Sequence, residues 1–289
     1  MLKMFFNRKK EKTNKVSLAL HETVSGEMVV SPSMAERELS TQTSLDLRPG
    51  AGHYRAYVGP PRRYDYMGAT QFALLFHMGL RDHHRVLDFG CGSLRLGRLL
   101  IPFLRESGYF GIDPNGWLIE DGLARELGND AAKLKAPKFS YNQDFNCNVF
   151  DQSFDFVIAQ SILTHTGADL FEAFLKSAKA SLAPGGVILF TYNGALDNKV
   201  PNRENGWHYP ECVDYTPPQV NALVESCGLV GRRLPWFHPR STWHAAALDE
   251  EHLPSQTDLE HLSGAVLRDE QFTKSLKPIH TRLNEPTPR

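Results

Sequence analysis

The sequence has little of what marks several common functional classes. Basic and acidic residues nearly balance, 32 against 33, so the strong positive excess of a bulk nucleic-acid binder is missing. No apolar run approaches the roughly 18–20 residues that a membrane helix needs. The four cysteines are far apart and form no C-x-x-C pair, which excludes a disulfide framework or a zinc ribbon. We therefore expect a cytoplasmic protein with no membrane span, no nucleic-acid partner and reduced thiols.

The two ends of the 289-residue chain are polar and weakly patterned. Residues 1–50 combine a basic head with a Ser/Thr/Glu-rich stretch, and we expect a flexible tail there. The basic head is either a solvated tail or a site of attraction to a phosphate-bearing partner, and its charges follow a very short apolar stretch, unlike a secretory signal. Residues 250–289 form a second polar tail. The domain is thus expected at residues 51–249.

Within that domain, short apolar segments alternate with segments of helical periodicity. Strands are predicted at 85–89, 109–113, 138–141, 154–159 and 187–192, and helices at 64–78, 94–104, 117–127 and 170–182. This alternation predicts an α/β fold with a mainly parallel sheet flanked by helices. After a helix at 218–227, strands at 229–234 and 242–248 have a short connection, which predicts an antiparallel hairpin.

The segment with the clearest chemical meaning follows the first strand. Asp88-x-Gly90-x-Gly92 joins a strand to a helix, and the glycines allow a tight turn against which a ligand can lie. A dinucleotide site would prefer a third glycine at the position of Arg95. A carboxylate before the turn repels a pyrophosphate, so it favours a ligand that carries positive charge.

Two further carboxylates follow the next two strands. Asp113 ends the second strand, where an acid can accept ribose hydroxyls, and Asp144 follows the third, where it could accept from an adenine amine. Three acids at neighbouring strand ends, without a phosphate-binding lysine, suit a cationic nucleoside. S-adenosylmethionine has the required sulfonium, amino acid, ribose and adenine.

At residues 62–248 the chain resembles the class I S-adenosylmethionine-dependent methyltransferases. The resemblance rests on an ordered set of motifs: VLDFGCGS (86–93), YFGIDPN (109–115), Asp144-Phe145, FDFVIAQSILTH (154–165) and LAPGG (182–186). It implies a Rossmann-like, seven-stranded, mainly parallel sheet with an antiparallel terminal hairpin. It also implies S-adenosylmethionine as cofactor. Leu94 departs from the pattern, since many members have a third glycine there, and Gly97 is the candidate for close helix packing instead.

The resemblance also implies positions for the cofactor-binding residues. The methionyl end is expected at the glycine turn, the ribose at the second strand end, and the adenine after the third. Gln160 is expected beside the sulfonium, and Gln71, on the preceding helix, is expected to close over the cofactor. The predicted cofactor-binding residues are Gln71, Asp88, Gly90, Gly92, Asp113, Asp144, Phe145 and Gln160.

The acceptor is expected beyond the fourth strand. His165 is the candidate general base, because its ordinary pKa of about 6.5 suits proton transfer near neutrality. The alternative is that it caps the next helix or packs against the cofactor. Residues 194–215 are long for a connection and are interpreted as a lid or acceptor-binding segment. The predicted acceptor-binding residues are Ser161, Trp207, His208 and Tyr209.

The resulting hypothesis is methyl transfer from S-adenosylmethionine to a small molecule or sugar. Oxygen is the preferred acceptor atom, and a nitrogen or carboxylate acceptor stays open. Two alternatives stay open at this point: a cofactor-binding protein without catalysis, and a dinucleotide-dependent oxidoreductase. No metal is expected, because the acids are assigned to the cofactor and no H-E-x-x-H motif is present. The sequence does not determine the oligomeric state.

Overall fold

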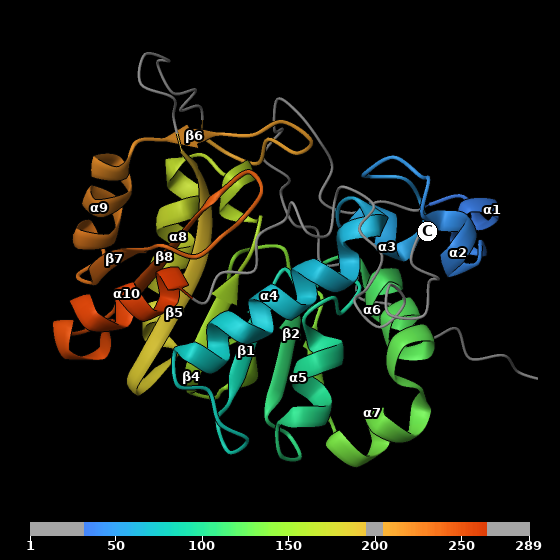
Figure 1. Ribbon diagram of the computed structural model, residues 1–289, viewed down its shortest axis with the longest axis horizontal. Coiled ribbons are helices and arrows are strands. Elements are labelled where there is room, and N and C mark those ends of the chain that lie inside the picture. The colour runs from blue at the N-terminus through green and yellow to red at the C-terminus, as the bar shows by residue number, and fades with distance from the viewer. Residues whose placement is uncertain (1–31, 195–204, 265–289) are drawn as a thin grey trace, which may run out of the picture.

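A twisted sheet with helices on both faces forms the centre of the molecule (Figure 1). The computed structural model describes residues 32–194 and 205–264. The strand order is β3-β2-β1-β4-β5-β8-β7, with β6 paired to the end of β5. The strands are β1 (Val86–Phe89), β2 (Tyr109–Ile112), β3 (Lys138–Ser140), β4 (Phe154–Ala159), β5 (Leu182–Gly194), β6 (Asp214–Tyr215), β7 (Val230–Leu234) and β8 (Thr242–Ala247).

The pairing confirms the predicted architecture. The sheet is parallel from β3 to β5, while β8 pairs antiparallel with both β5 and β7. The α-helices are α1 (Met34–Arg37), α2 (Thr41–Ser44), α3 (Tyr54–Tyr57), α4 (Tyr64–His77), α5 (Gly97–Phe103), α6 (Gly116–Gly122), α7 (Asn129–Lys135), α8 (Ala168–Ala180), α9 (Pro217–Ser226) and α10 (Gln256–Gly264).

The core divides into two layers, because side chains of a strand alternate between the faces of the sheet. Leu87 and Phe89 of β1 pack on the α8 and α9 side, whereas Val86 packs on the side covered by α4, α5 and α10. Burying both faces requires nearly continuous apolar strands, and all four residues of β1 are buried. The carboxyl ends of these strands then meet at one edge of the sheet.

The helix expected at 94–104 begins later, at Gly97. Leu94 has a φ of +60° and is fully buried, so the turn continues through a left-handed residue before the helix starts. Gly97 provides the close approach of helix and sheet, since a Cβ there would lie 2.7 Å from the Tyr109 hydroxyl. The helix expected at 117–127 is α6 followed by a π-helical turn over Leu123–Leu127.

The predicted boundary at residue 50 is wrong for the described part of the N-terminal segment. Residues 34–44 contain α1 and α2, and Arg37 forms two hydrogen bonds with the carboxylate of Asp121. Glu36 also accepts a hydrogen bond from the backbone of Gly52. These contacts attach residues 34–52 to α6. The basic head lies outside the described residues.

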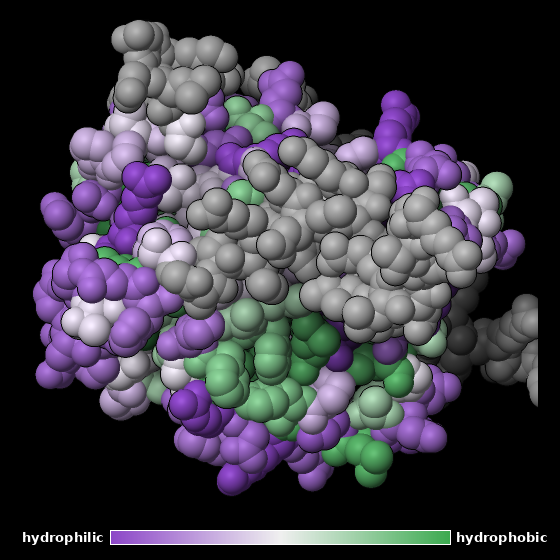
Figure 2. Space-filling view, in the orientation of Figure 1, coloured by the Kyte–Doolittle hydropathy of each residue, from purple (hydrophilic) through white to green (hydrophobic). Residues whose placement is uncertain are grey.

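The C-terminal boundary also shifts. Helix α10 packs on the α4 and α5 side of the sheet through the buried Leu262, so the domain extends beyond residue 249. Figure 2 shows apolar side chains gathered on this face over α4. Phe76 is 48% exposed there and contacts Phe103. Of the helices in the described ranges, none is long and apolar enough to cross a membrane.

Candidate active site

A cavity of about 440 Å³ lies at the carboxyl ends of β1, β2 and β4. Its floor comes from the turns after these strands and contains Gly90, Asp113 and Gln160. Residues 49–50 and 57–60 line one part of the cavity, and Trp207, Tyr209 and Pro210 line another together with the connection between β7 and β8. The carboxyl edge of a parallel sheet is where open α/β folds bind their ligands.

The glycine turn lets a ligand lie close against the backbone. Gly90 and Gly92 have φ values of +75° and +51°, and both line the cavity. The backbone N–H groups of Gly90 and Cys91 bond to the carbonyl of Ile112, which ties the turn to β2. A Cβ at Gly90 would lie 2.2 Å from Ile162, so only glycine fits between the turn and the segment that follows β4.

Asp113 is held at the second strand end by three hydrogen bonds. One carboxylate oxygen accepts from the backbone N–H of Gly92 at 3.0 Å, and the other accepts from the backbone and side chain of Asn115. Burial nevertheless raises the pKa of Asp113 above its usual value. A carboxylate offers about four acceptor positions, so one stays available toward the cavity.

Asp88 lies beneath the glycine turn and is not among the residues that line the cavity. It belongs to the sheet face covered by α4 and α5, and its carboxylate accepts a hydrogen bond of 2.8 Å from the Tyr109 hydroxyl. Burial raises its pKa to about 7, although Tyr109 and the charge of Arg95 oppose the shift. Asp88 therefore acts on the cavity through the turn and not by contact.

The third strand end differs from the prediction by one residue. Asp144 is exposed and accepts hydrogen bonds from the backbone of Asn146 and the side chain of Asn142, as a turn residue does. Its neighbours Gln143 and Phe145 line the cavity instead. Phe145 is buried with a φ of +58°, and this left-handed residue directs the ring into the cavity wall.

Gln160 lines the cavity, and its amide orientation follows from His238. The Nδ1 atom of His238 accepts backbone N–H bonds from Arg240 and Ser241, so it carries no proton and Nε2 is the donor. Gln160 lies 3.3 Å from that Nε2 and must present its amide oxygen to it. Its NH₂ group then occupies the buried position that has no partner among the described residues. Gln71 is buried in α4 and does not line the cavity.

His165 lines the cavity with its ring oriented by the backbone. The carbonyl of Glu211 accepts from its Nδ1 at 2.5 Å, which fixes the tautomer and leaves Nε2 as the basic atom. Burial lowers the pKa of His165, so the ring is neutral at physiological pH. His165 does not cap the next helix, because Gly167 is at the N-cap position of α8.

Two segments meet over the cavity. Trp207 and Tyr209 line it with nearly parallel rings, and both contact His165. Tyr57 of α3 contacts Tyr209 from the opposite wall at a ring separation of 6.4 Å. His208 points elsewhere: it is buried outside the lining, and its backbone N–H bonds to the carbonyl of His165. Of the predicted lid, residues 195–204 lie outside the described residues.

Three arginines line the cavity that the sequence analysis did not select: Arg63, Arg95 and Arg240. Arg95 follows the glycine turn, donates to the carbonyl of Val58, and has a buried Nε without a described partner. Arg240 comes from the β7–β8 connection, with its guanidinium 4.0 Å from the thiol of Cys212. The signal for Arg95 was its place in the motif; nothing in the local sequence marked Arg240.

The predicted residues thus fall into two groups. Those that line the cavity are Gly90, Gly92, Asp113, Phe145, Gln160, Ser161, His165, Trp207 and Tyr209. Those that do not are Gln71, Asp88, Asp144 and His208. The sequence analysis missed Tyr57 and Gln143 in addition to the arginines, because neither belongs to a motif.

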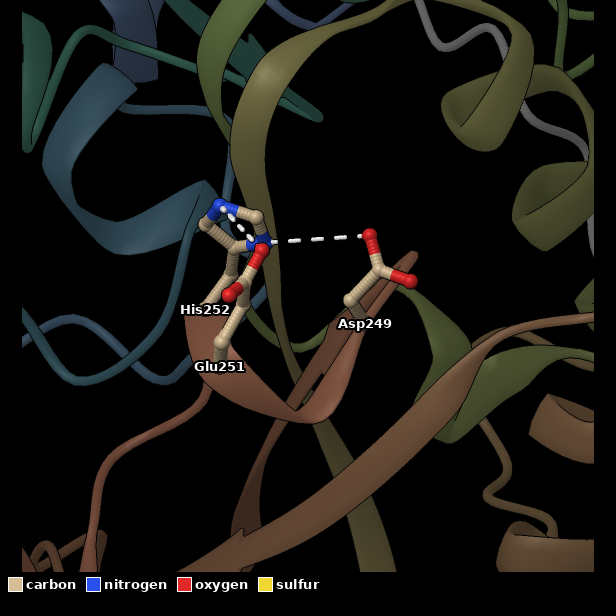
Figure 3. Close-up of side chains that lie close together, drawn as sticks. All are labelled: Asp249, Glu251 and His252. Atoms are coloured by element: carbon tan, nitrogen blue, oxygen red, sulfur yellow. Dashed lines mark ion pairs between the residues drawn. The ribbon is translucent and has the colours of Figure 1, made fainter.

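A separate cluster of possible metal ligands lies on the surface after β8. Asp249, Glu251 and His252, which are drawn in Figure 3, lie side by side, and their ligand atoms are within 4.8 Å of one another. Both carboxylates are exposed, and none of the three residues lines the cavity. Exposed acidic groups of this kind are common without an ion, so the cluster does not change the chemistry of the site.

The cavity suits a cationic nucleoside with an amino acid end. Asp113 offers an acceptor for a hydroxyl, and Phe145, Ile112 and Leu118 form an apolar surface for a base. The guanidinium of Arg95 lines the cavity beside the glycine turn, and its positive charge suits a carboxylate. S-adenosylmethionine has each of these groups, so the residues present fit it.

A family model described as a methyltransferase domain matches residues 60–263. Solved structures with similarity include a magnesium protoporphyrin IX methyltransferase from Synechocystis PCC 6803 with bound SAH (13% identity, 64% of this chain and 83% of that chain, TM-score 0.46). A glycopeptide N-methyltransferase is 13% identical, covers 63% of this chain and 90% of its own, and has a TM-score of 0.49. The CcbJ methyltransferase from Streptomyces caelestis is 16% identical over 71% and 93%, with a TM-score of 0.48.

The family match covers more than half of the chain and includes the glycine turn, the strand ends and the terminal hairpin. Together with the strand order, it excludes the alternative of a dinucleotide-dependent oxidoreductase. The chain belongs to the methyltransferase domain family, the class I S-adenosylmethionine-dependent methyltransferases, and S-adenosylmethionine is its cofactor.

Proposed function

We propose that this methyltransferase acts on an oxygen atom of a small molecule or sugar, with His165 as the general base. The observation that carries the proposal is the fixed tautomer of His165. Its Nδ1 donates to the carbonyl of Glu211, and its ring lines the cavity, so the lone pair on Nε2 is free to accept a proton. A hydroxyl acceptor must lose a proton as it is methylated, which gives this base a purpose.

The cofactor-binding roles follow the cavity lining. Asp113 accepts from a ribose hydroxyl through its remaining acceptor position, and Phe145 and Gln143 contact the adenine. Arg95 pairs with the carboxylate of the methionyl group, and Gly90 and Gly92 let that group lie against the backbone. When bound, the cofactor supplies an electrophilic methyl group on a sulfonium. The protein supplies orientation and excludes water.

The acceptor lies between the proposed base and the two covering segments. Trp207 and Tyr209 give it an apolar wall next to His165, and Tyr57 closes the opposite side. Ser161, held with a φ of +61° by a hydrogen bond to Thr191, positions the segment after β4. The base and the acceptor-binding residues thus come from different parts of the chain and converge at the cavity mouth.

Exchange of the base tests the proposal. We expect His165→Ala to keep its affinity for S-adenosylmethionine, measured by calorimetry, and to lose about 10²–10⁴-fold in turnover of a hydroxyl acceptor. Because burial lowers the pKa of His165, wild-type turnover should rise through a pKa below 6.5 and be constant at neutral pH.

The matched control is His208→Ala, which alters the adjacent segment without removing a residue that lines the cavity. Equal loss of cofactor affinity and turnover in His165→Ala would show that His165 is a packing contact. Turnover of amines but of no hydroxyl compound would refute the assignment of oxygen as the acceptor atom.

A further inference from the structure

The cavity has an excess of positive charge among its described lining residues. Three guanidinium groups, from Arg63, Arg95 and Arg240, face a single lining carboxylate, that of Asp113. His238 lies among these arginines and stays neutral, because burial first and the arginine charges next lower its pKa to about 3. S-adenosylmethionine carries two positive groups and one carboxylate, so its binding increases the excess.

The arginines come from different segments of the chain and lie close enough to His238 to act on it together. Arg95 directly follows the glycine turn, where the proposed function puts the methionyl carboxylate. Arg240 belongs to the connection between β7 and β8, on the side of the proposed base. No carboxylate within residues 32–194 and 205–264 forms an ion pair with Arg240, and its guanidinium contacts the Cys212 thiol at 4.0 Å.

Cys212 links Arg240 to the proposed base. Its sulfur lies 3.9 Å from the Nδ1 atom of His165 and 4.0 Å from a guanidinium nitrogen of Arg240. Burial is the main cause of the lowered pKa of His165, and the positive charge of Arg240 is close enough to add to it. Arg240 and the Nδ1 edge of His165 therefore flank one side chain, and both residues also line the cavity.

We propose that the methyl acceptor is an anion whose carboxylate or phosphate pairs with Arg240 while its hydroxyl faces His165. This inference rests on the proposed function, because it assigns the acceptor of that same site. The guanidinium group forms two parallel hydrogen bonds with either oxyanion, and this geometry orients the acceptor as well as holding it. Arg240 is exposed at the cavity mouth, so it can attract an anion from solution.

The test compares acids with neutral compounds of the same shape. Protein loaded with S-adenosylhomocysteine is titrated with 4-hydroxybenzoate, 4-hydroxybenzamide and phenyl phosphate by calorimetry. We expect at least one of the two acids to bind on the order of tenfold more tightly than the amide, with a preference that weakens as salt is added. The acid that binds better identifies the oxyanion as carboxylate or phosphate.

Variants connect that preference to one side chain. Arg240→Gln should remove the preference for the acid, and Arg240→Lys should retain part of it. Arg233→Gln, an equal change of charge on exposed β7 outside the cavity, should retain all of it. Equal binding of acid and amide, an unchanged preference in Arg240→Gln, or no binding of either acid below about 10 mM would overturn the proposal.

Failure of this inference can be told apart from failure of the proposed function. If Arg240→Gln weakens S-adenosylhomocysteine but not 5′-methylthioadenosine, which lacks the carboxylate, then Arg240 binds the cofactor and the anionic acceptor is refuted. Turnover of an anionic hydroxyl compound at the wild-type rate by Arg240→Gln would also refute it while leaving oxygen methylation in place. Loss of hydroxyl turnover on His165→Ala with retained acid binding would support both.

Discussion

Replacing Asp88 by asparagine should change how stability depends on pH. Asp88 is 5% exposed, lies beneath the glycine turn, and has a pKa raised to about 7 by burial. Its carboxyl group therefore keeps its proton in the folded protein at pH values where the unfolded chain, with a pKa of about 3.9, has lost it. Ionising Asp88 at neutral pH thus costs free energy of folding.

The magnitude and sign follow from that difference in pKa. Between about pH 4 and pH 7 the folded state binds more protons at this site than the unfolded state, so stability falls as the pH rises. A difference of about three pKa units corresponds to about 4 kcal/mol. Above pH 7 both states are ionised at this site, and the contribution becomes constant.

The amide of the Asp88→Asn variant does not titrate, and its oxygen should still accept from the Tyr109 hydroxyl. We expect the variant and the wild type to have similar stability at pH 4, and the variant to gain up to about 4 kcal/mol at pH 8. Urea unfolding of cofactor-free protein at intervals across this range measures both curves. Their difference isolates Asp88, because the histidines titrate in both proteins. Parallel curves would refute the assignment of a raised pKa to Asp88.

The remaining predictions concern the cofactor, the turn and the N-terminal segment. Asp113→Asn should weaken S-adenosylmethionine binding by about tenfold to a hundredfold, because it loses a charge-assisted hydrogen bond. Asp144→Asn should change this affinity little, because Asp144 does not line the cavity. Equal effects of the two substitutions in calorimetry would contradict the lining described above. Gly90→Ala should lower the free energy of unfolding by about 1–3 kcal/mol, because its Cβ would overlap Ile162. Adding Ile162→Ala should restore part of that stability by removing the overlap. If the double variant is no more stable in thermal unfolding, backbone strain at residue 90 dominates the loss. Deletion of residues 1–50 should reduce cofactor affinity, because residues 49 and 50 line the cavity. Deletion of residues 1–31 should leave cofactor affinity unchanged, because it keeps every described contact. Equal affinities of the two deletion variants would support a domain boundary at residue 50.

The sequence by itself determined the sheet and part of the cavity lining. Parallel strands bury both faces, so each reads as an apolar run, and the alternation with helices predicted the mainly parallel sheet correctly. The residue after each strand falls at one edge of the sheet. Local position along the chain was therefore enough to bring Gly90, Gly92 and Asp113 to the cavity.

Which of two neighbouring residues reaches the cavity was decided by backbone geometry that the sequence pattern does not show. Side chains alternate along β1, which turns Asp88 to the Tyr109 side of the sheet. At the third strand end, Asp144 forms a hydrogen-bonded turn and the next residue, Phe145, is left-handed. As a result Gln143 lines the cavity and the expected acid, Asp144, does not. A spacing argument places residues to within one position, and at a turn one position separates a lining residue from an exposed one.

Tertiary structure brought together the lining residues that no sequence motif marks. Residues 49–60, the segment at 207–210 and Arg240 are distant in sequence and meet only because the ends of the sheet, α3 and the terminal hairpin pack around one edge. None of these segments has a local pattern, since their shape is fixed by the contacts they make and not by periodicity. The positive charge along the cavity is thus a property of the folded chain, because side chains brought together by packing produce it.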